Sequence, residues 1–189
     1  MILSNRFSEA LTYAAQLHAT QVRKGSGVSY STHLLGTASI ALEYGANEDE
    51  AIAALLHDAI EDRGGATTRE AIRQRFGDTV TAIVDGCTDS DETPKPPWRQ
   101  RKQAYIDRIS TASGSVRLVW AADKLYNVRS ILKDYRQLGD LVWERFKGGK
   151  DGSLWYYRSL VEAFRQAELT PIVEELDRTV LELEQFSEG

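Results

Sequence analysis

Apolar residues recur at steps of three and four along most of this chain, and that spacing is what most constrains its fold. The first example comprises Phe7, Leu11, Ala14, Ala15 and Leu17. Because residues three and four apart share one face of an α-helix, each such stretch predicts a helix with a buried stripe. The alternation typical of β-strands is weak throughout. We therefore expect an all-α fold, a helical bundle of roughly nine or ten helices.

Cap residues locate the boundaries of the second and third helices. Apolar residues from Leu34 to Leu42 predict the second helix, which Gly45 can end as a C-terminal cap. Asn47 and Glu50 have the spacing of a capping box, in which each side chain bonds the backbone N–H of the other residue. This pair predicts the start of a third helix, which we expect to continue through the stretch AALLHDAIED.

Threonine and glycine residues predict where the next two helices begin. Thr67 or Thr68 can cap a short fourth helix that ends at Phe76. Gly77-Asp78 then opens a fifth helix that we expect to run through Val84.

A proline-rich stretch, Asp89 to Pro97, separates these helices from the basic segment WRQRKQAYIDRI. Further helical stretches follow in SVRLVWAADKLYNVRSILKDY, WERF, SLWYYRSLVEAFRQAEL and after Pro171. The proline-rich stretch indicates a loop rather than a domain linker, because motif residues on both sides of it predict one site. We expect a single domain over residues 1–189.

Composition excludes several classes of function. The net charge of -5 argues against binding of DNA or RNA through a basic face. Cys87 is the only cysteine, which excludes an intrachain disulfide and a thiolate metal cage. No signal peptide and no apolar run of roughly 20 residues for a membrane span is apparent. We therefore expect a cytoplasmic protein that binds no membrane.

The stretch AALLHDAIED, Ala53 to Asp62, begins as an apolar helix and ends in four ionisable side chains. Helical spacing would place Glu61 one turn beyond His57 and Asp58, so the four polar groups cluster. A cluster with three carboxylates is unfavourable unless a bound cation, a Lys or Arg partner or open water accompanies it.

Two further residues give this cluster the donors of a metal site. His33 lies one predicted helix before His57, and Asp123 ends the apolar run at Trp120. Nitrogen and oxygen donors without thiolate suit a divalent first-row ion, and Mn²⁺, Fe²⁺, Co²⁺ and Zn²⁺ are all chemically plausible. Four protein ligands on an octahedral ion leave positions for water and a phosphate oxygen. The alternative is a satisfied core histidine, because adjacent His-Asp occurs by chance in many proteins.

The motifs QVRKGSGVSYSTH, LLHDAIED and ADKLYNVRSI keep one order over residues 21–131. In this order the chain resembles the HD-domain metal-dependent phosphohydrolases, and within them the hydrolase domain of the RelA/SpoT family and the small alarmone hydrolases. The resemblance implies an HD-domain helical bundle. The motif HDxxED together with the distant Asp-x-Leu-x-Asn is far more specific than His-Asp alone.

Carried over residue by residue, the resemblance implies a metal site and a catalytic pair. The implied metal ligands are His33, His57, Asp58 and Asp123, and among the first-row ions we expect Mn²⁺. Glu61 and Asp62 would orient or deprotonate the attacking water.

The resemblance also implies a set of substrate-binding residues. Arg23 and Lys24 would face the nucleotide, with Arg23 able to stack on the base. Asn127 would bind near the ribose. Arg101 and Lys102 match a segment that contacts phosphates in the family, although a solvated charged face is the alternative reading of both.

Some positions depart from the family pattern or stand outside it. Ser29 and Leu34 occupy places where the family commonly has proline, and Tyr126 replaces a frequent histidine. None of these changes removes a metal donor. We expect His18 to be structural, because no acidic partner is apparent near it on the first helix.

The resemblance implies a metal-dependent hydrolase that removes the 3′-pyrophosphate from (p)ppGpp or (p)ppApp, giving pyrophosphate and GDP/GTP or ADP/ATP. Because too little chain remains for a synthetase half, we expect degradation only, with a possible functional pairing with an alarmone synthetase. The alternatives are another HD-type nucleotide phosphohydrolase, or a non-catalytic protein that senses nucleotides or neutralises a toxin. The choice of base and the oligomeric state stay open.

Overall fold

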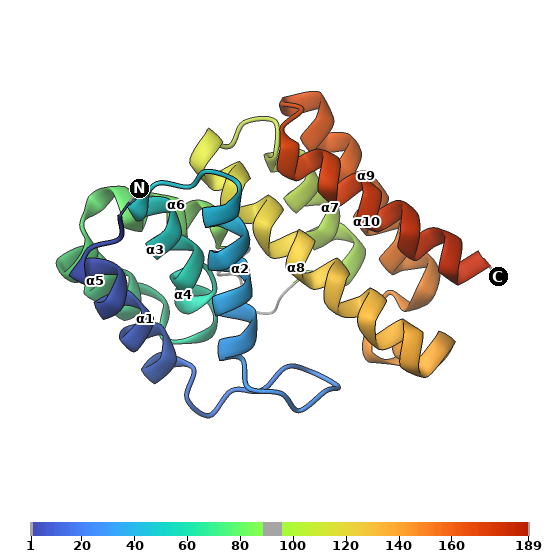
Figure 1. Cartoon of the computed structure of the whole chain (residues 1–189), viewed down its shortest axis with the longest axis horizontal. Helices are drawn as coiled ribbons and strands as arrows, with labels where there is room; N and C mark the ends of the chain where they lie inside the picture. The colour runs from blue at the N-terminus through green and yellow to red at the C-terminus, as the bar shows by residue number, and fades with distance from the viewer. Residues whose placement is uncertain (1, 89–95, 189) are drawn as a thin grey trace. The chain divides into compact units, whose positions relative to one another are not determined.

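The computed structural model describes residues 2–88 and 96–188, and over these residues the chain is all-α. This confirms the predicted fold class (Figure 1). The only β-type pairing among them is an isolated bridge between Val22 and Ser29. The described helices are α1 (Asn5–Leu17), α2 (Ser31–Glu43), α3 (Glu48–Leu56), α4 (Ala59–Asp62), α5 (Gly65–Phe76), α6 (Asp78–Cys87), α7 (Trp98–Arg108), α8 (Gly114–Leu138), the 3₁₀ helix η1 (Gly139–Arg145), α9 (Gly149–Ala167) and α10 (Pro171–Glu188).

The chain divides into two compact units, which we describe separately. The first unit, Met1–Lys95 with Ser113–Asp123, holds α1 to α6 and the first part of α8. The second unit, Pro96–Ala112 with Lys124–Gly189, holds α7, the rest of α8, η1, α9 and α10. The single domain expected over residues 1–189 stays a prediction.

Helix α3 forms the centre of the first unit. All six residues from Ala51 to Leu56 are fully buried. A helix that is apolar all round must be covered on every side, and α1, α2 and α6 pack against it. The C-terminal end of this buried helix leads directly into the His-Asp pair.

The predicted caps between α2 and α3 are confirmed. The N–H groups of Gly45 and Ala46 donate to the carbonyls of Leu42 and Ala41 at 3.1 and 3.0 Å, and Gly45 has a φ of 91°. This is the Schellman ending that glycine favours because it has no Cβ. The Asn47–Glu50 capping box is also formed, with hydrogen bonds of 2.8 and 3.0 Å.

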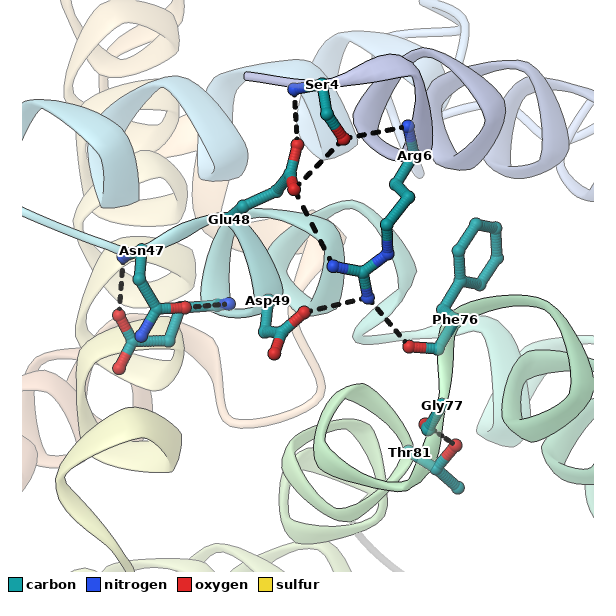
Figure 2. Close-up of polar contacts among 9 residues, drawn as sticks. Ser4, Arg6, Asn47, Glu48, Asp49, Phe76, Gly77 and Thr81 are labelled. Carbon is teal, nitrogen blue, oxygen red and sulfur yellow. Dashed lines mark hydrogen bonds and ion pairs between the residues drawn. The ribbon is translucent and has the colours of Figure 1, made fainter. Parts of the chain in front are cut away.

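Arg6 ties α1 to two other helices of the first unit (Figure 2). Its guanidinium donates to Asp49 at 2.8 Å and to the Phe76 carbonyl at 2.9 Å. Glu48 receives the backbone N–H of Ser4 at 2.5 Å. Acidic residues at the start of α3 also face the positive end of the helix dipole, so these contacts stabilise α3 at its N-terminus.

The predicted start of α5 is wrong. The helix begins at Gly65 rather than after Thr67 or Thr68, because Gly64 and Gly65 take φ values of 116° and 52° that reverse the chain earlier. The Thr68 hydroxyl instead donates back to the carbonyl of Arg63. The end of α5 at Phe76 is as predicted.

Later boundaries are partly as expected. Helix α6 begins at Asp78, as predicted, but runs on to Cys87 instead of ending at Val84. The WERF stretch overlaps η1, a 3₁₀ helix. Residues 89–95 of the predicted proline-rich loop lie outside the described residues.

The second unit is held together by an apolar seam between α9 and α10. The seam buries Leu160, Phe164, Leu176, Val180 and Leu183. At its edge the Arg158 guanidinium binds the carboxylates of Asp177, at 2.8 Å, and of Glu184. Nowhere in the described parts of the chain is a helix both long and apolar enough to cross a membrane.

Candidate metal centre

The His-Asp pair interrupts the helix that the sequence predicted to be continuous. Helix α3 ends at Leu56 and α4 begins at Ala59, so a continuous helix through the motif is wrong. Asp58 has a ψ of -3°, well away from the usual helical value near -42°, and this opens the turn. One helical bond survives, from the Asp62 N–H to the Asp58 carbonyl at 2.9 Å. Asp62 therefore remains about one turn beyond Asp58.

Four donor atoms from separate parts of the first unit meet at the end of α3. His33 comes from α2, His57 and Asp58 from the turn after α3, and Asp123 from α8. The Nε2 atoms of His33 and His57 lie 3.2 Å apart. From Asp58 Oδ2 these two nitrogens lie at 3.4 and 3.1 Å, and from Asp123 Oδ1 at 3.4 and 3.8 Å.

These separations suit a shared divalent ion. Ligand atoms about 2.1 Å from an ion lie about 3.0 Å apart at adjacent octahedral corners and about 3.4 Å apart at tetrahedral corners. The distances between the two histidine nitrogens, and from these nitrogens to each carboxylate oxygen, fall in or near this range. Of these residues, His33, His57 and Asp58 form a group able to hold a metal ion. The donor set, without thiolate, fits a first-row divalent cation.

The two histidines are held differently. Nδ1 of His57 lies 2.9 Å from the Ala54 carbonyl, so it carries a proton and turns Nε2 toward the cluster. Burial alone would lower the pKa of His57, but the Asp58 carboxylate, Asp123 and the Ala54 carbonyl together outweigh burial and raise the pKa to about 9. In contrast, burial lowers the pKa of His33 and favours its neutral form, the form that binds metal.

The Asp58 carboxylate is held in the charged form by its neighbours. Burial would raise the pKa of Asp58, but the positive charge of His57 and the hydrogen bonds from His33 and His57 hold it well below its usual range. Asp123 is only 6% exposed and lies beside the same two imidazoles.

Tyr30, to which the sequence assigned no role, contacts Asp58. Its hydroxyl donates to Asp58 Oδ2 at 2.5 Å, and its ring stacks on His18 at 5.2 Å between centroids. Burial, and then the negative charges of Asp58, Asp62 and Asp123, raise the pKa of Tyr30. The hydroxyl therefore stays protonated and able to donate, and Asp62 is close enough for its charge to act on Tyr30.

The predicted catalytic pair lies in α4, directly after the cluster. Glu61 is partly exposed and Asp62 is exposed. Asp62 Oδ2 accepts a hydrogen bond of 2.7 Å from Gln21 Nε2. Sequence reasoning missed Gln21, because nothing in its local sequence indicates a partner on α4.

Arg23 and Lys24 lie in the segment between α1 and α2. The Arg23 guanidinium lies 6.0 Å from the centre of the Tyr30 ring, and the Arg23 N–H donates to the Val28 carbonyl at 2.7 Å. Lys24 is exposed. The structure thus brings Arg23 to the tyrosine that contacts Asp58.

The remaining predicted substrate residues belong to the second unit. Arg101 and Lys102 lie on α7, where the Lys102 ammonium sits 4.7 Å from the Tyr156 ring centre. Asn127 lies in the part of α8 after Lys124. All three residues lie in the second unit, and their contact with a nucleotide stays a prediction.

The chain matches the family model described as HD domain over residues 10–153, a range that contains the whole cluster. It is 40% identical over 126 residues to the guanosine-3′,5′-bis(diphosphate) 3′-pyrophosphohydrolase MESH1 of Xenopus tropicalis, covering 65% of this chain and 68% of that protein. The Homo sapiens protein of the same name is 36% identical over 126 residues, with the same coverage.

A solved structure shows the same fold. It is described as a metazoan orthologue of SpoT that hydrolyses ppGpp and plays a role in starvation responses. The TM-score is 0.80 at 25% sequence identity, and the match covers 97% of this chain and 98% of the other. The likeness thus extends over nearly all of both chains.

Proposed function

The chain belongs to the HD-domain family, and we propose that it is a metal-dependent hydrolase that removes the 3′-pyrophosphate from a guanosine alarmone such as ppGpp. Water attacks the phosphorus bound to the 3′ oxygen, and the bond between these two atoms breaks. The products are pyrophosphate and a nucleoside 5′-diphosphate or triphosphate whose 3′ hydroxyl is restored.

The observation that carries the proposal is the convergence of two imidazoles and two carboxylates: the Nε2 atoms of His33 and His57 lie 3.2 Å apart, and an oxygen of Asp58 and one of Asp123 each lie 3.1 to 3.8 Å from both nitrogens. These four residues would hold one divalent cation, for which we propose Mn²⁺. When bound, the cation polarises the phosphoryl oxygen and makes the attacking water more acidic. Tyr30 and the Ala54 carbonyl orient the donors Asp58 and His57.

The other residues of the first unit divide the work between chemistry and binding. Glu61 and Asp62 orient the attacking water and accept its proton, as general bases placed one turn from Asp58. Arg23 and Lys24 bind the nucleotide, Lys24 through phosphate charge and Arg23 through phosphate or base stacking. In the second unit, we assign Arg101 and Lys102 to phosphate and Asn127 to the ribose.

The test is an assay of pyrophosphate release over a panel of ppGpp, pppGpp, ppApp, GTP, ATP and deoxynucleotides. With Mn²⁺ we expect pyrophosphate from the 3′-pyrophosphorylated nucleotides and none from the others. An excess of chelator should abolish turnover, and added Mn²⁺ should restore it. Turnover that continues in chelator after the metal is shown to be gone would overturn the proposal, as would orthophosphate release from 5′ positions alone.

A matched pair of variants assigns the activity to the cluster. His57→Ala should lose both the metal and turnover. Arg73→Ala, which changes an exposed side chain on α5 that pairs with Glu70, should keep both. Equal metal content in the two variants would return His57 to the role of a core histidine.

A further inference from the structure

Gln21 occupies a position between three side chains of the first unit. Its Nε2 donates to Asp62 Oδ2 at 2.7 Å. Its Oε1 accepts from Arg63 Nη2 at 2.6 Å and lies 2.8 Å from His18 Nδ1. The amide thus joins the C-terminal end of α1 to the C-terminal end of α4.

The partners fix which way the amide points. Arg63 has only donors, so the amide atom that faces it must be the oxygen. The Asp62 carboxylate has only acceptors, so the atom that faces it must be the nitrogen. Both requirements are met by one orientation of Gln21, and they leave no freedom to flip.

The same logic fixes the tautomer of His18. Because Gln21 Oε1 is an acceptor, His18 must carry its proton on Nδ1. Burial lowers the pKa of His18, which favours the neutral ring with a single N–H. His18 is 0% exposed and stacked on Tyr30, so it gives Gln21 a rigid support.

Gln21 also belongs to the segment that carries Arg23 and Lys24, the cationic side chains predicted to bind the substrate. Its carbonyl accepts the Tyr30 N–H at 2.9 Å, and Val22 next to it pairs with Ser29. These contacts close the loop that holds Arg23. One residue therefore connects the substrate-binding loop to a carboxylate of the catalytic pair.

We propose that Gln21 is a positioning residue for Asp62, an inference that rests on the role of Asp62 given above. An exposed carboxylate on a short helix would otherwise rotate freely. The Gln21 N–H fixes Oδ2 and leaves Oδ1 to face the attacking water. The positive charge of Arg63 polarises the amide and strengthens this hydrogen bond.

Two substitutions separate the donor from the bulk of the side chain. Gln21→Glu keeps the size and the acceptor for Arg63 and His18, but it replaces the donor to Asp62 with a carboxylate oxygen. Gln21→Ala removes both the donor to Asp62 and the acceptor for Arg63 and His18. The matched control is Gln16→Ala, an exposed glutamine on α1.

Steady-state kinetics on the nucleotide that the wild type hydrolyses tests the role. We expect both Gln21 variants to lose roughly 10- to 100-fold in kcat, the range for supporting residues of metal sites. KM, metal content and melting temperature should stay close to wild type, and Gln16→Ala should be unaltered throughout. In an Asp62→Asn background, Gln21→Glu should cause no further loss. An unchanged kcat in Gln21→Glu, or an equal further loss in the Asp62→Asn background, would overturn the inference.

A second measurement tests the hydrogen bond without any turnover, so failure of the proposed function and failure of this inference are distinguishable. The side-chain amide protons of Gln21 should exchange slowly with solvent in NMR spectra of the wild type. Asp62→Ala should make that exchange fast, while the backbone spectrum of the fold is retained. Fast exchange in the wild type would overturn the inference even for an active hydrolase.

Discussion

The Nε2 atoms of His33 and His57 lie 3.2 Å apart, although the two residues come from different helices. Two imidazole nitrogens at this distance either share a proton or share a cation. An oxygen of Asp58 and an oxygen of Asp123 each lie 3.1 to 3.8 Å from both nitrogens, an arrangement that favours positive charge at the cluster, as a proton or as a cation.

This competition predicts how pH acts on the metal-free protein. The Asp58 carboxylate, against the effect of burial, raises the pKa of His57 from 6.5 to about 9. The contribution of protonated His57 to the free energy of unfolding is therefore fully present below pH 6.5 and is lost as pH rises through about 9. The lowered pKa of His33 acts oppositely, since it destabilises the fold only as pH falls below 6.5. Thermal unfolding of the chelator-treated protein should show a melting temperature that falls from pH 6.5 to 9.

Metal affinity should follow the opposite trend over the same range. Mn²⁺ must displace the His57 proton, so its apparent affinity should rise with pH and binding should release protons. Calorimetry in buffers of different ionisation enthalpy measures that release. A Mn²⁺ affinity that does not change between pH 6.5 and 9 would remove His57 from the ligand set.

Replacement of the catalytic pair should separate chemistry from binding. The double variant Glu61→Gln and Asp62→Asn keeps size and hydrogen bonding but removes the base. We expect it to fold, retain metal and bind nucleotide, yet lose at least about a hundredfold in kcat. A near-normal kcat would show that the pair is only a helix end.

Loss of a cationic side chain that is proposed to bind the substrate should act on binding instead. Arg23→Ala removes a group that contributes roughly 1 to 3 kcal/mol if it pairs with phosphate or base. We expect a raised KM with kcat nearly unchanged, whereas Arg73→Ala should alter neither. If KM and nucleotide affinity stay at the wild-type values in Arg23→Ala, Arg23 takes no part in binding the substrate.

The packing of α8 against α6 offers a test of the first unit's core. A Cβ on Gly86 would lie 2.5 Å from a methyl group of Val116, which is 6% exposed. Gly86→Ala should therefore lower the free energy of unfolding by about 1 to 3 kcal/mol in denaturant titrations. Gly114→Ala is the control, because a Cβ there meets nothing within 4 Å. Val116→Ala should partly rescue Gly86→Ala, and an additive loss would contradict the clash.

Local signals in the sequence predicted the helices well where caps are made by neighbours. The Asn47–Glu50 box and the Gly45 ending each depend on residues close in the chain, and both are formed. The Thr67 or Thr68 cap failed because the preceding glycines were free to turn the chain first. The break after Leu56 also escaped prediction, since AALLHDAIED has helical spacing throughout.

The sequence motifs predicted which residues make up the candidate site, but not which residues contact them and hold them in place. The resemblance to a known family identified four candidate ligands, His33, His57, Asp58 and Asp123. The structure brings donor atoms of these residues together. Gln21 and Tyr30 act on residues 41 and 28 positions away. Such pairs depend on tertiary packing, which helical periodicity does not encode. His18, which we expected to be structural, is buried, but the sequence did not predict its link to Asp62 through Gln21.

Hydrolysis of ppGpp in water enriched in ¹⁸O, with Mn²⁺ present and the products separated by mass spectrometry, shows which phosphorus the water attacks. Attack on the phosphorus of the 3′ group predicts one ¹⁸O atom in the released pyrophosphate and none in the GDP. The Asp123→Ala variant, which lacks one proposed metal ligand, should give no labelled product. Label in the nucleotide product, or labelled orthophosphate in place of pyrophosphate, would rule out attack at that phosphorus.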